Sequence, residues 1–203
     1  MYERDQKMIA DFARIGPKAL ARVALFATLS ARQPFIRMAP IMRDVDKLGA
    51  KSAHAWSGHK ADAVAFWSDP TRAQAAYDAL YWLEACAPGG QWLASEALYY
   101  LAAEVPGLGM AKGGFVLQMV FGLGGCIDVN NLALYDIPPR LACLRADWPS
   151  HILRKRCAEY IELCARFGTP ASLWDQWCEY VGARDGISAD RVSRDHSRII
   201  CRA

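Results

Sequence analysis

Asp128 is the acidic side chain whose neighbours in the sequence most suggest chemistry. It follows an apolar run that ends in Gly124 and Gly125, and it precedes Val129 and Asn130. A carboxylate fixed near a reacting carbon stabilises positive charge that develops there, and it can orient or deprotonate a water molecule. The structural alternative is that Asp128 only caps the helix that it begins, since Asp is a preferred N-cap residue.

A glycine hairpin upstream of this Asp could supply a second chemical element, an anion site. Residues 105–109 read Val-Pro-Gly-Leu-Gly between two helical patterns. The proline cannot continue the first helix, and the glycines allow a tight bend with positive φ. Because the next helix begins at once, its first N–H groups point out of the bend, where they can bind phosphate. We therefore expect phosphate contacts from Gly107, Leu108, Gly109 and Met110.

Together, the hairpin, the apolar helix, the Gly-rich loop and the Asp resemble the helix-hairpin-helix–Gly/Pro–Asp DNA glycosylase superfamily. The resemblance covers residues 104–131, and Asp-x-Asn at 128–130 is similar to the adenine-glycosylase branch. It implies double-stranded DNA with an extruded base as the partner, and hydrolysis of the N-glycosidic bond as the reaction. Asp128 would then stabilise the sugar cation and activate water. Asn130 would position Asp128 or a phosphate.

Lys112 departs from the pattern of the family. Members with lyase activity carry a Lys two residues after the second hairpin Gly, but that position is Ala111 here. One residue turns a helical side chain by about 100°. We therefore expect Lys112 to contact a phosphate or solvent, and the enzyme to be monofunctional. Lyase chemistry through a Schiff base at Lys112 stays open as the alternative.

Three further side chains are candidates for a base pocket. Trp92 and Tyr99 have helical spacing before the hairpin and suit base stacking, although such aromatic residues more often belong to the core. Gln118 could read a base edge, but on an apolar helix we favour a hydrogen bond to neighbouring backbone.

Neither a metal site nor a cofactor is expected. His54 and His59 lack further ligands at a suitable spacing. Some members of the family hold a four-cysteine iron–sulfur cluster, but Cys157 and Cys164 are not followed by two close cysteines. The sequence also contains no Walker loop, dinucleotide fingerprint or nucleophile elbow.

Composition agrees with a folded protein, and the charge distribution suggests an anionic partner, with a solvated helix face as the alternative. The chain has 203 residues, of which 53% are hydrophobic, enough for one domain with a core. Residues 1–60 contain eleven Lys and Arg against five Asp and Glu, whereas residues 61–139 contain two against eight. The seven cysteines form no CxxC pair, which favours reduced thiols in a cytoplasm. No apolar run is long enough for a membrane helix.

The elements that must position these residues are helices nearly throughout, because β-branched residues are sparse and no period-2 alternation occurs. The pattern predicts helices over 7–15, 18–30, 70–87, 91–104, 110–121, 128–135, 149–167 and 170–181. We expect one all-α domain over 1–203, a helix-hairpin-helix glycosylase-like bundle with a cleft between two helical clusters. It would comprise basic N-terminal helices (1–60), the hairpin, Gly loop and Asp (91–135), and C-terminal helices (149–182) with a polar tail.

The leading hypothesis is a monomeric DNA glycosylase in the cytoplasm of a bacterium or of a phage-infected host. One alternative is a base-hypermodification transferase on the same scaffold, since the short chain and Ala111 resemble divergent helix-hairpin-helix proteins of tailed phages. The other alternative is a DNA-binding module without catalysis.

Overall fold

The structure is a computed structural model and describes residues 1–31, 33–86, 91–145 and 147–202, without the side chains of residues 91 and 92. These residues form eleven α-helices and no strand, which confirms the all-α class. The predicted turn at Pro88-Gly89-Gly90 lies outside them. The helices are α1 (Tyr2–Ala13), α2 (Pro17–Leu29), α3 (Met38–Leu48), α4 (His59–Trp67), α5 (Pro70–Cys86), α6 (Gln91–Tyr99), α7 (Gly109–Val116), α8 (Val129–Leu134), α9 (Ser150–Phe167), α10 (Pro170–Asp185) and α11 (Ala189–Cys201).

Several helices begin where capping residues predict. A proline occupies the first position of α2, α5 and α10, where its missing N–H group costs no helical hydrogen bond. The Asp69 carboxylate accepts hydrogen bonds from the N–H groups of Thr71 (2.9 Å) and Arg72 (3.2 Å) at the start of α5. The Thr169 hydroxyl accepts from the N–H of Ser172 (3.2 Å) at the start of α10. These starts therefore follow from local chemistry.

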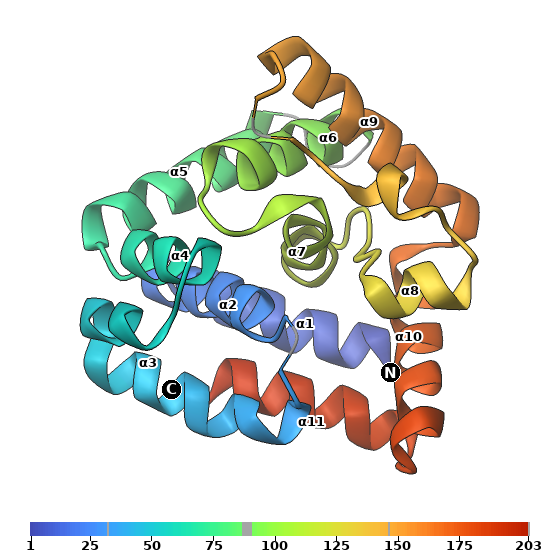
Figure 1. Cartoon of the computed structure of the whole chain (residues 1–203), viewed down its shortest axis with the longest axis horizontal. Helices are drawn as coiled ribbons and strands as arrows, with labels where there is room; N and C mark the ends of the chain where they lie inside the picture. Colours follow the sequence, from blue (N-terminus) through green and yellow to red (C-terminus); the bar gives the residue numbers. More distant parts are fainter. Residues whose placement is uncertain (32, 87–90, 146, 203) are drawn as a thin grey trace.

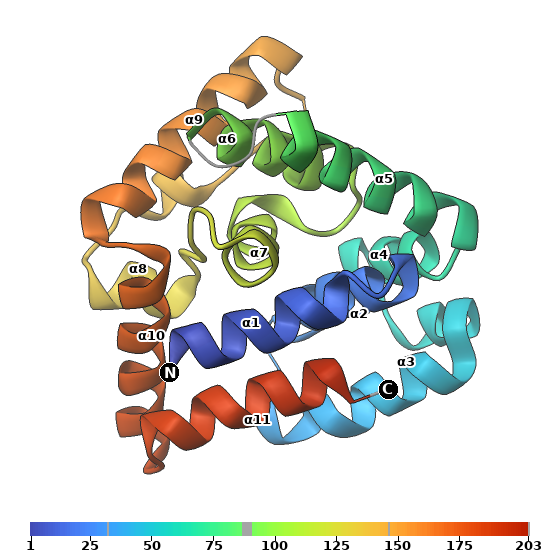
Figure 2. The ribbon, with the colours of Figure 1, turned by 180° about the vertical axis from the view of Figure 1, so that it is seen from behind.

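Helix α7 lies at the centre of the molecule, where Figure 1 shows it end-on with the other helices around it. Helices α5, α6 and α9 cover one side, and α1 and α2 cover the other. Figure 2 shows α11 and α3 as an outer layer beyond α1 and α2. Most of α7 is buried, including Gly113, Gly114, Phe115 and Val116, as expected for a helix in which Lys112 is the one charged residue.

Both helices that flank the hairpin end in a wider, π-helical turn. Helix α6 continues into Tyr100–Glu104, and α7 continues into Leu117–Phe121. The second π turn ends at Gly122, whose φ of 69° is left-handed. The predicted helices 91–104 and 110–121 are thus present with altered last turns, a feature often found beside functional sites.

Both chain ends contain more helix than the sequence predicted. Helix α1 begins at Tyr2 rather than at residue 7, because the Asp175 carboxylate accepts a hydrogen bond from the Tyr2 N–H (3.0 Å). The expected polar tail after Gly182 instead completes α10 and forms α11, which packs against α1, α2 and α10. Its buried stripe is narrow and partly polar, with Val192, His196 and Ile200 at intervals of four residues.

Candidate active site

The hairpin has the predicted backbone but faces partly inward. Gly107 and Gly109 have φ values of 88° and 62°, which L side chains rarely adopt. A Cβ atom on Gly107 would lie 2.5 Å from the His59 carbonyl oxygen, so the bend packs against α4, whereas Gly109 has open space. Leu108 and Met110 are buried. The backbone around Gly109 is therefore the part of the hairpin that can meet a phosphate.

The glycine loop between α7 and α8 is held close to α7. A Cβ atom on Gly114 would lie 2.2 Å from the Gly125 carbonyl oxygen, so only glycine permits this approach. The hydroxyl of the fully buried Tyr160 donates to that same carbonyl (3.1 Å) and accepts from the Ile127 N–H (2.7 Å). These contacts fix the backbone immediately before Asp128.

The Gln118 side chain also holds this glycine loop, through hydrogen bonds of its amide group. Its side-chain oxygen accepts from the Cys126 N–H (3.0 Å), and its side-chain nitrogen donates to the Pro170 carbonyl (2.7 Å). Both polar ends of the amide are therefore used by backbone, as the sequence favoured. Gln118 positions the loop, and its amide is not free to read a base.

Asp128 both caps α8 and lines a large cleft. One carboxylate oxygen accepts from the N–H groups of Asn130 (2.8 Å) and Asn131 (3.2 Å), and the other accepts from the Asn130 side chain (3.3 Å). Arg184 donates to the Asn130 side-chain oxygen (3.0 Å). The structural and chemical interpretations of Asp128 are therefore compatible, because the capping contacts hold a half-buried carboxylate in a fixed orientation.

The cleft has a volume of about 1570 Å³ and lies between α7, α8 and α10 on one side and α2, α3 and α11 on the other. It brings together Asp128, Asn130, Lys112 and Gln118. The four hairpin positions expected to bind phosphate, residues 107–110, do not line it. Such a volume is ample for an extruded nucleotide, since ligand pockets are typically about 300–1,000 Å³.

Lys112 lies on the cleft wall, although it stands one residue after the position expected for a lyase lysine. Ala111, Lys112, Phe115 and Gln118 all line the cleft, so the wall takes up more than 100° of the surface of α7. Within the described part of the chain, the Lys112 ammonium makes no hydrogen bond or ion pair. The structure thus places an amine in the same cleft as the Asp128 carboxylate.

The described lining of the cleft is rich in cations. It contains seven basic and four acidic side chains: Arg22, Arg43, Lys112, Arg184, Arg191, Arg198 and Arg202, with Asp46, Asp128, Asp185 and Asp195. Arg22 is tied to Asp46 and to the Ile200 carbonyl (2.7 Å). The basic N-terminal third therefore supplies only part of this charge, and the C-terminal helices supply most of the rest.

Of the two aromatic pocket candidates, Tyr99 does not line the described cleft. Tyr99 lines a second, smaller pocket of about 700 Å³ beside α5 and α9. Its hydroxyl donates to Glu104 (2.8 Å), and Arg154 lies 4.0 Å over its ring. The side chain of Trp92 lies outside the described residues.

The cleft is also lined by a set of ring side chains that the sequence did not indicate as site residues. We call this set the aromatic floor. These are Phe26, Phe35, Phe115, Trp174, Trp177 and His196, from α2, the segment before α3, α7, α10 and α11. The sequence signal for Trp174 and Trp177 was only that of core anchors. His196 gave no signal, since its helix was not predicted.

No group of three or more potential metal-ligating side chains occurs among the residues that the structure describes. None of the helices in the described ranges has the length and apolar character to cross a bilayer. Comparison with protein-family models, with curated proteins and with solved structures finds no match to this chain.

Proposed function

We propose that this protein is a DNA N-glycosylase of the helix-hairpin-helix–Gly/Pro–Asp type, which extrudes a modified or mispaired base and hydrolyses its glycosidic bond. The observation that carries the proposal is the Asp128 carboxylate, fixed by three hydrogen bonds on the wall of a cation-rich cleft. Rigid loop contacts before Asp128 and the left-handed glycines of the hairpin support it.

In the proposed reaction, the bond between C1′ and the base nitrogen breaks, and its electron pair leaves with the base. Positive charge then develops on the sugar, and the Asp128 carboxylate stabilises that charge. Water adds to C1′ and gives a proton to Asp128, which releases it to solvent, while the departing base takes up a proton from solvent, so that one water is consumed overall. The products are an abasic deoxyribose and the free base. Because the capping bonds orient Asp128 before substrate arrives, little reorganisation is needed.

DNA would enter along the cationic walls. Arg43 on α3 and Arg198 on α11 are exposed on the same side of the cleft, and cations of this kind supply sequence-independent attraction to phosphates. Two apolar side chains that line the cleft are strongly exposed: Ile36 is 84% exposed and Val129 is 74% exposed. DNA-bending proteins insert such side chains between base steps. We assign Ile36 and Val129 to the gap that an extruded nucleotide leaves.

The test compares Asp128→Asn with Asp69→Asn. Each change removes one N-cap charge and keeps a capping oxygen, but Asp69 caps α5 and does not line the cleft. Both variants and the unaltered protein are incubated with duplexes that carry a panel of modified and mispaired bases. Abasic sites from the unaltered protein and from Asp69→Asn, with a loss of about 10²-fold or more in Asp128→Asn, are expected.

Other products would refute excision in favour of an alternative. A mass increase on the base would identify a base-modifying transferase. DNA binding with no altered nucleotide would identify a binding module. Excision that survives Asp128→Asn unchanged would mean that the carboxylate does not stabilise the sugar cation.

Lys112 gives a specific reason to test strand cleavage as a second activity. Its amine could condense with the aldehyde of the open abasic sugar, release water and form an imine, after which the 3′-phosphate leaves by β-elimination. Borohydride reduces such an imine to a stable protein–DNA adduct. The control is Lys155→Ala, a change on α9 outside the cleft. The lyase step would be established if the adduct is lost in Lys112→Ala and kept in Lys155→Ala. No adduct would establish a monofunctional enzyme.

A further inference from the structure

The aromatic floor is a preassembled set of rings around one histidine. Phe35 stacks on the His196 ring at 4.2 Å between centroids. The Trp174 and Trp177 rings lie nearly perpendicular to the His196 ring, with centroid distances of 5.6 and 5.1 Å. The two indole rings stack on each other at 5.3 Å between centroids. Phe26 also meets the His196 ring edge-on, at 5.6 Å. All of these rings line the cleft that holds Asp128, so they offer a flat, apolar partner for a nucleobase.

The surroundings of His196 fix both its charge and its tautomer. Its side chain is only 7% exposed, and this burial lowers the pKa of the ring to about 4. The positive charge of Lys112 lowers the pKa further, whereas the negative charges of Asp5 and Asp195 raise it. The ring is therefore neutral near pH 7. Its Nδ1 atom lies 2.8 Å from the Val192 carbonyl, and because a carbonyl only accepts, Nδ1 carries the proton.

The other ring nitrogen, Nε2, is then a hydrogen-bond acceptor. It has no hydrogen-bond partner among the residues that the structure describes, although the ring that carries it lines the cleft. Nε2 is not among the fully buried polar atoms that lack a partner, so it is accessible from the cleft, where water or a ligand can satisfy it. A ligand that bonds to Nε2 must present an N–H or O–H group.

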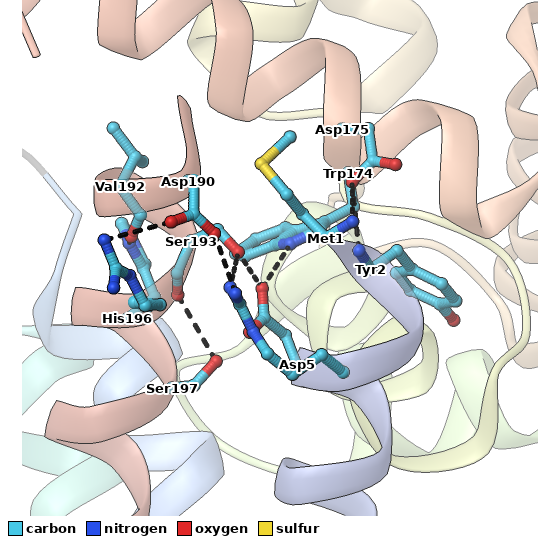
Figure 3. Close-up of polar contacts among 12 residues, drawn as sticks. Met1, Tyr2, Asp5, Trp174, Asp175, Asp190, Val192, Ser193, His196 and Ser197 are labelled. Carbon is cyan, nitrogen blue, oxygen red and sulfur yellow. Dashed lines mark hydrogen bonds and ion pairs between the residues drawn. The ribbon is translucent and has the colours of Figure 1, made fainter. Parts of the chain in front are cut away.

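A buried polar network holds Trp174, one ring of the aromatic floor, in place (Figure 3). The fully buried Asp5 carboxylate on α1 accepts from the Trp174 indole N–H (3.1 Å) and from the Ser193 hydroxyl on α11. Arg4 donates to the other oxygen of Asp5 (3.1 Å) and reaches Asp190 (2.7 Å). Helices α1, α10 and α11 are thus joined directly behind the rings, which favours a rigid pocket.

We propose that the His196 Nε2 atom accepts a hydrogen bond from an N–H group on the edge of a nucleobase that stacks in the aromatic floor. This inference rests on the proposed function only in that a base must leave the duplex and enter the cleft. His196 then determines specificity, favouring bases that keep a ring or exocyclic N–H group over bases in which alkylation has removed it.

The test uses duplexes with one mispaired nucleotide whose sugar carries a 2′-fluorine, which resists glycosidic cleavage. One pair of probes compares uracil with 3-methyluracil, and the other compares cytosine with N4,N4-dimethylcytosine. In each pair, methylation removes the donor. We expect the donor-bearing member of at least one pair to bind about tenfold more tightly, the factor typical of one buried neutral hydrogen bond. The preference should vanish in His196→Phe, which keeps an aromatic ring.

Each outcome separates this inference from the glycosylase proposal. Equal binding within both pairs, or a preference that persists in His196→Phe, would overturn the role of His196. The nitrogen-15 shift of His196 Nε2 in the unaltered protein gives a second measurement, should His196→Phe not fold. That resonance should move on binding of the donor-bearing probe, and an unmoved resonance would also overturn the inference. Because the probes cannot be cleaved, a donor preference without excision of natural sugars would contradict only the glycosylase proposal.

Discussion

Tyr160→Phe tests whether the loop before Asp128 must be held rigidly. The Tyr160 hydroxyl is buried and makes two hydrogen bonds, one from the Ile127 N–H (2.7 Å) and one to the Gly125 carbonyl (3.1 Å). Removing the hydroxyl leaves a buried N–H group without its partner, which typically costs about 1–3 kcal/mol. For a chain of this size, that corresponds to a decrease in melting temperature of roughly 3–10 °C.

The activity of this variant distinguishes a local effect from a general one. Because Ile127 precedes Asp128 directly, we expect single-turnover excision to fall by about tenfold or more while the affinity for DNA stays within about twofold, since a small misplacement of a catalytic group is costly. The matched control is Tyr135→Phe, which removes an exposed hydroxyl that donates to Gln176 (2.6 Å). A Tyr160→Phe variant with unaltered stability and excision would refute the reasoning that these bonds position Asp128.

Three other perturbations give graded expectations. Gly107→Ala should lower the free energy of unfolding by about 2–4 kcal/mol, because its Cβ would overlap α4 at a positive φ, whereas Gly109→Ala should cost about 1 kcal/mol from backbone strain alone; urea titration compares the two. Ile36→Ala should slow excision by about tenfold at saturating DNA, while Ile15→Ala, equally exposed but away from the cleft, should not. His196 is protonated below about pH 6.5 in the unfolded chain but only near pH 4 in the native protein. The free energy of unfolding should therefore fall by up to about 3 kcal/mol as the pH falls through this window. Urea titrations at pH 7 and pH 4 measure this fall, and His196→Phe should remove the part that comes from His196.

Local chemistry explains what the sequence predicted. Proline at the first helical position, an Asp or Thr before it, and glycines in the bend each act through neighbouring backbone, so the start of α5 and the left-handed φ of Gly107 and Gly109 were predictable. The same holds for Asp128 as an N-cap residue. Its place on the cleft wall depends on how α2, α3, α10 and α11 assemble around α7 and α8, and the local sequence does not determine it.

The rest of the site depends on contacts between distant segments. Helix α11 was missed because its buried stripe places His196 and serines where apolar residues would signal a helix, and distant segments, chiefly α1 and α10, complete its packing. Of the aromatic floor, only His196 lies on the missed helix; Trp174 and Trp177 were interpreted as core anchors, because their place on the cleft depends on α2, α7 and α11. That Lys112 and Ala111 both reach the cleft could not be predicted, because the width of the cleft wall depends on α2, α3 and α10.

The central claim is that an extruded nucleotide enters this cleft with its sugar beside Asp128. The most direct measurement is a structure of the protein bound to a duplex with one 2′-fluorinated, mispaired nucleotide. We expect a carboxylate oxygen of Asp128 within about 3–4 Å of C1′, the base on the aromatic floor and the backbone of Gly109 at a phosphate. A complex in which the base stays stacked in the duplex, or in which the DNA lies on a face remote from Asp128, would contradict the claim.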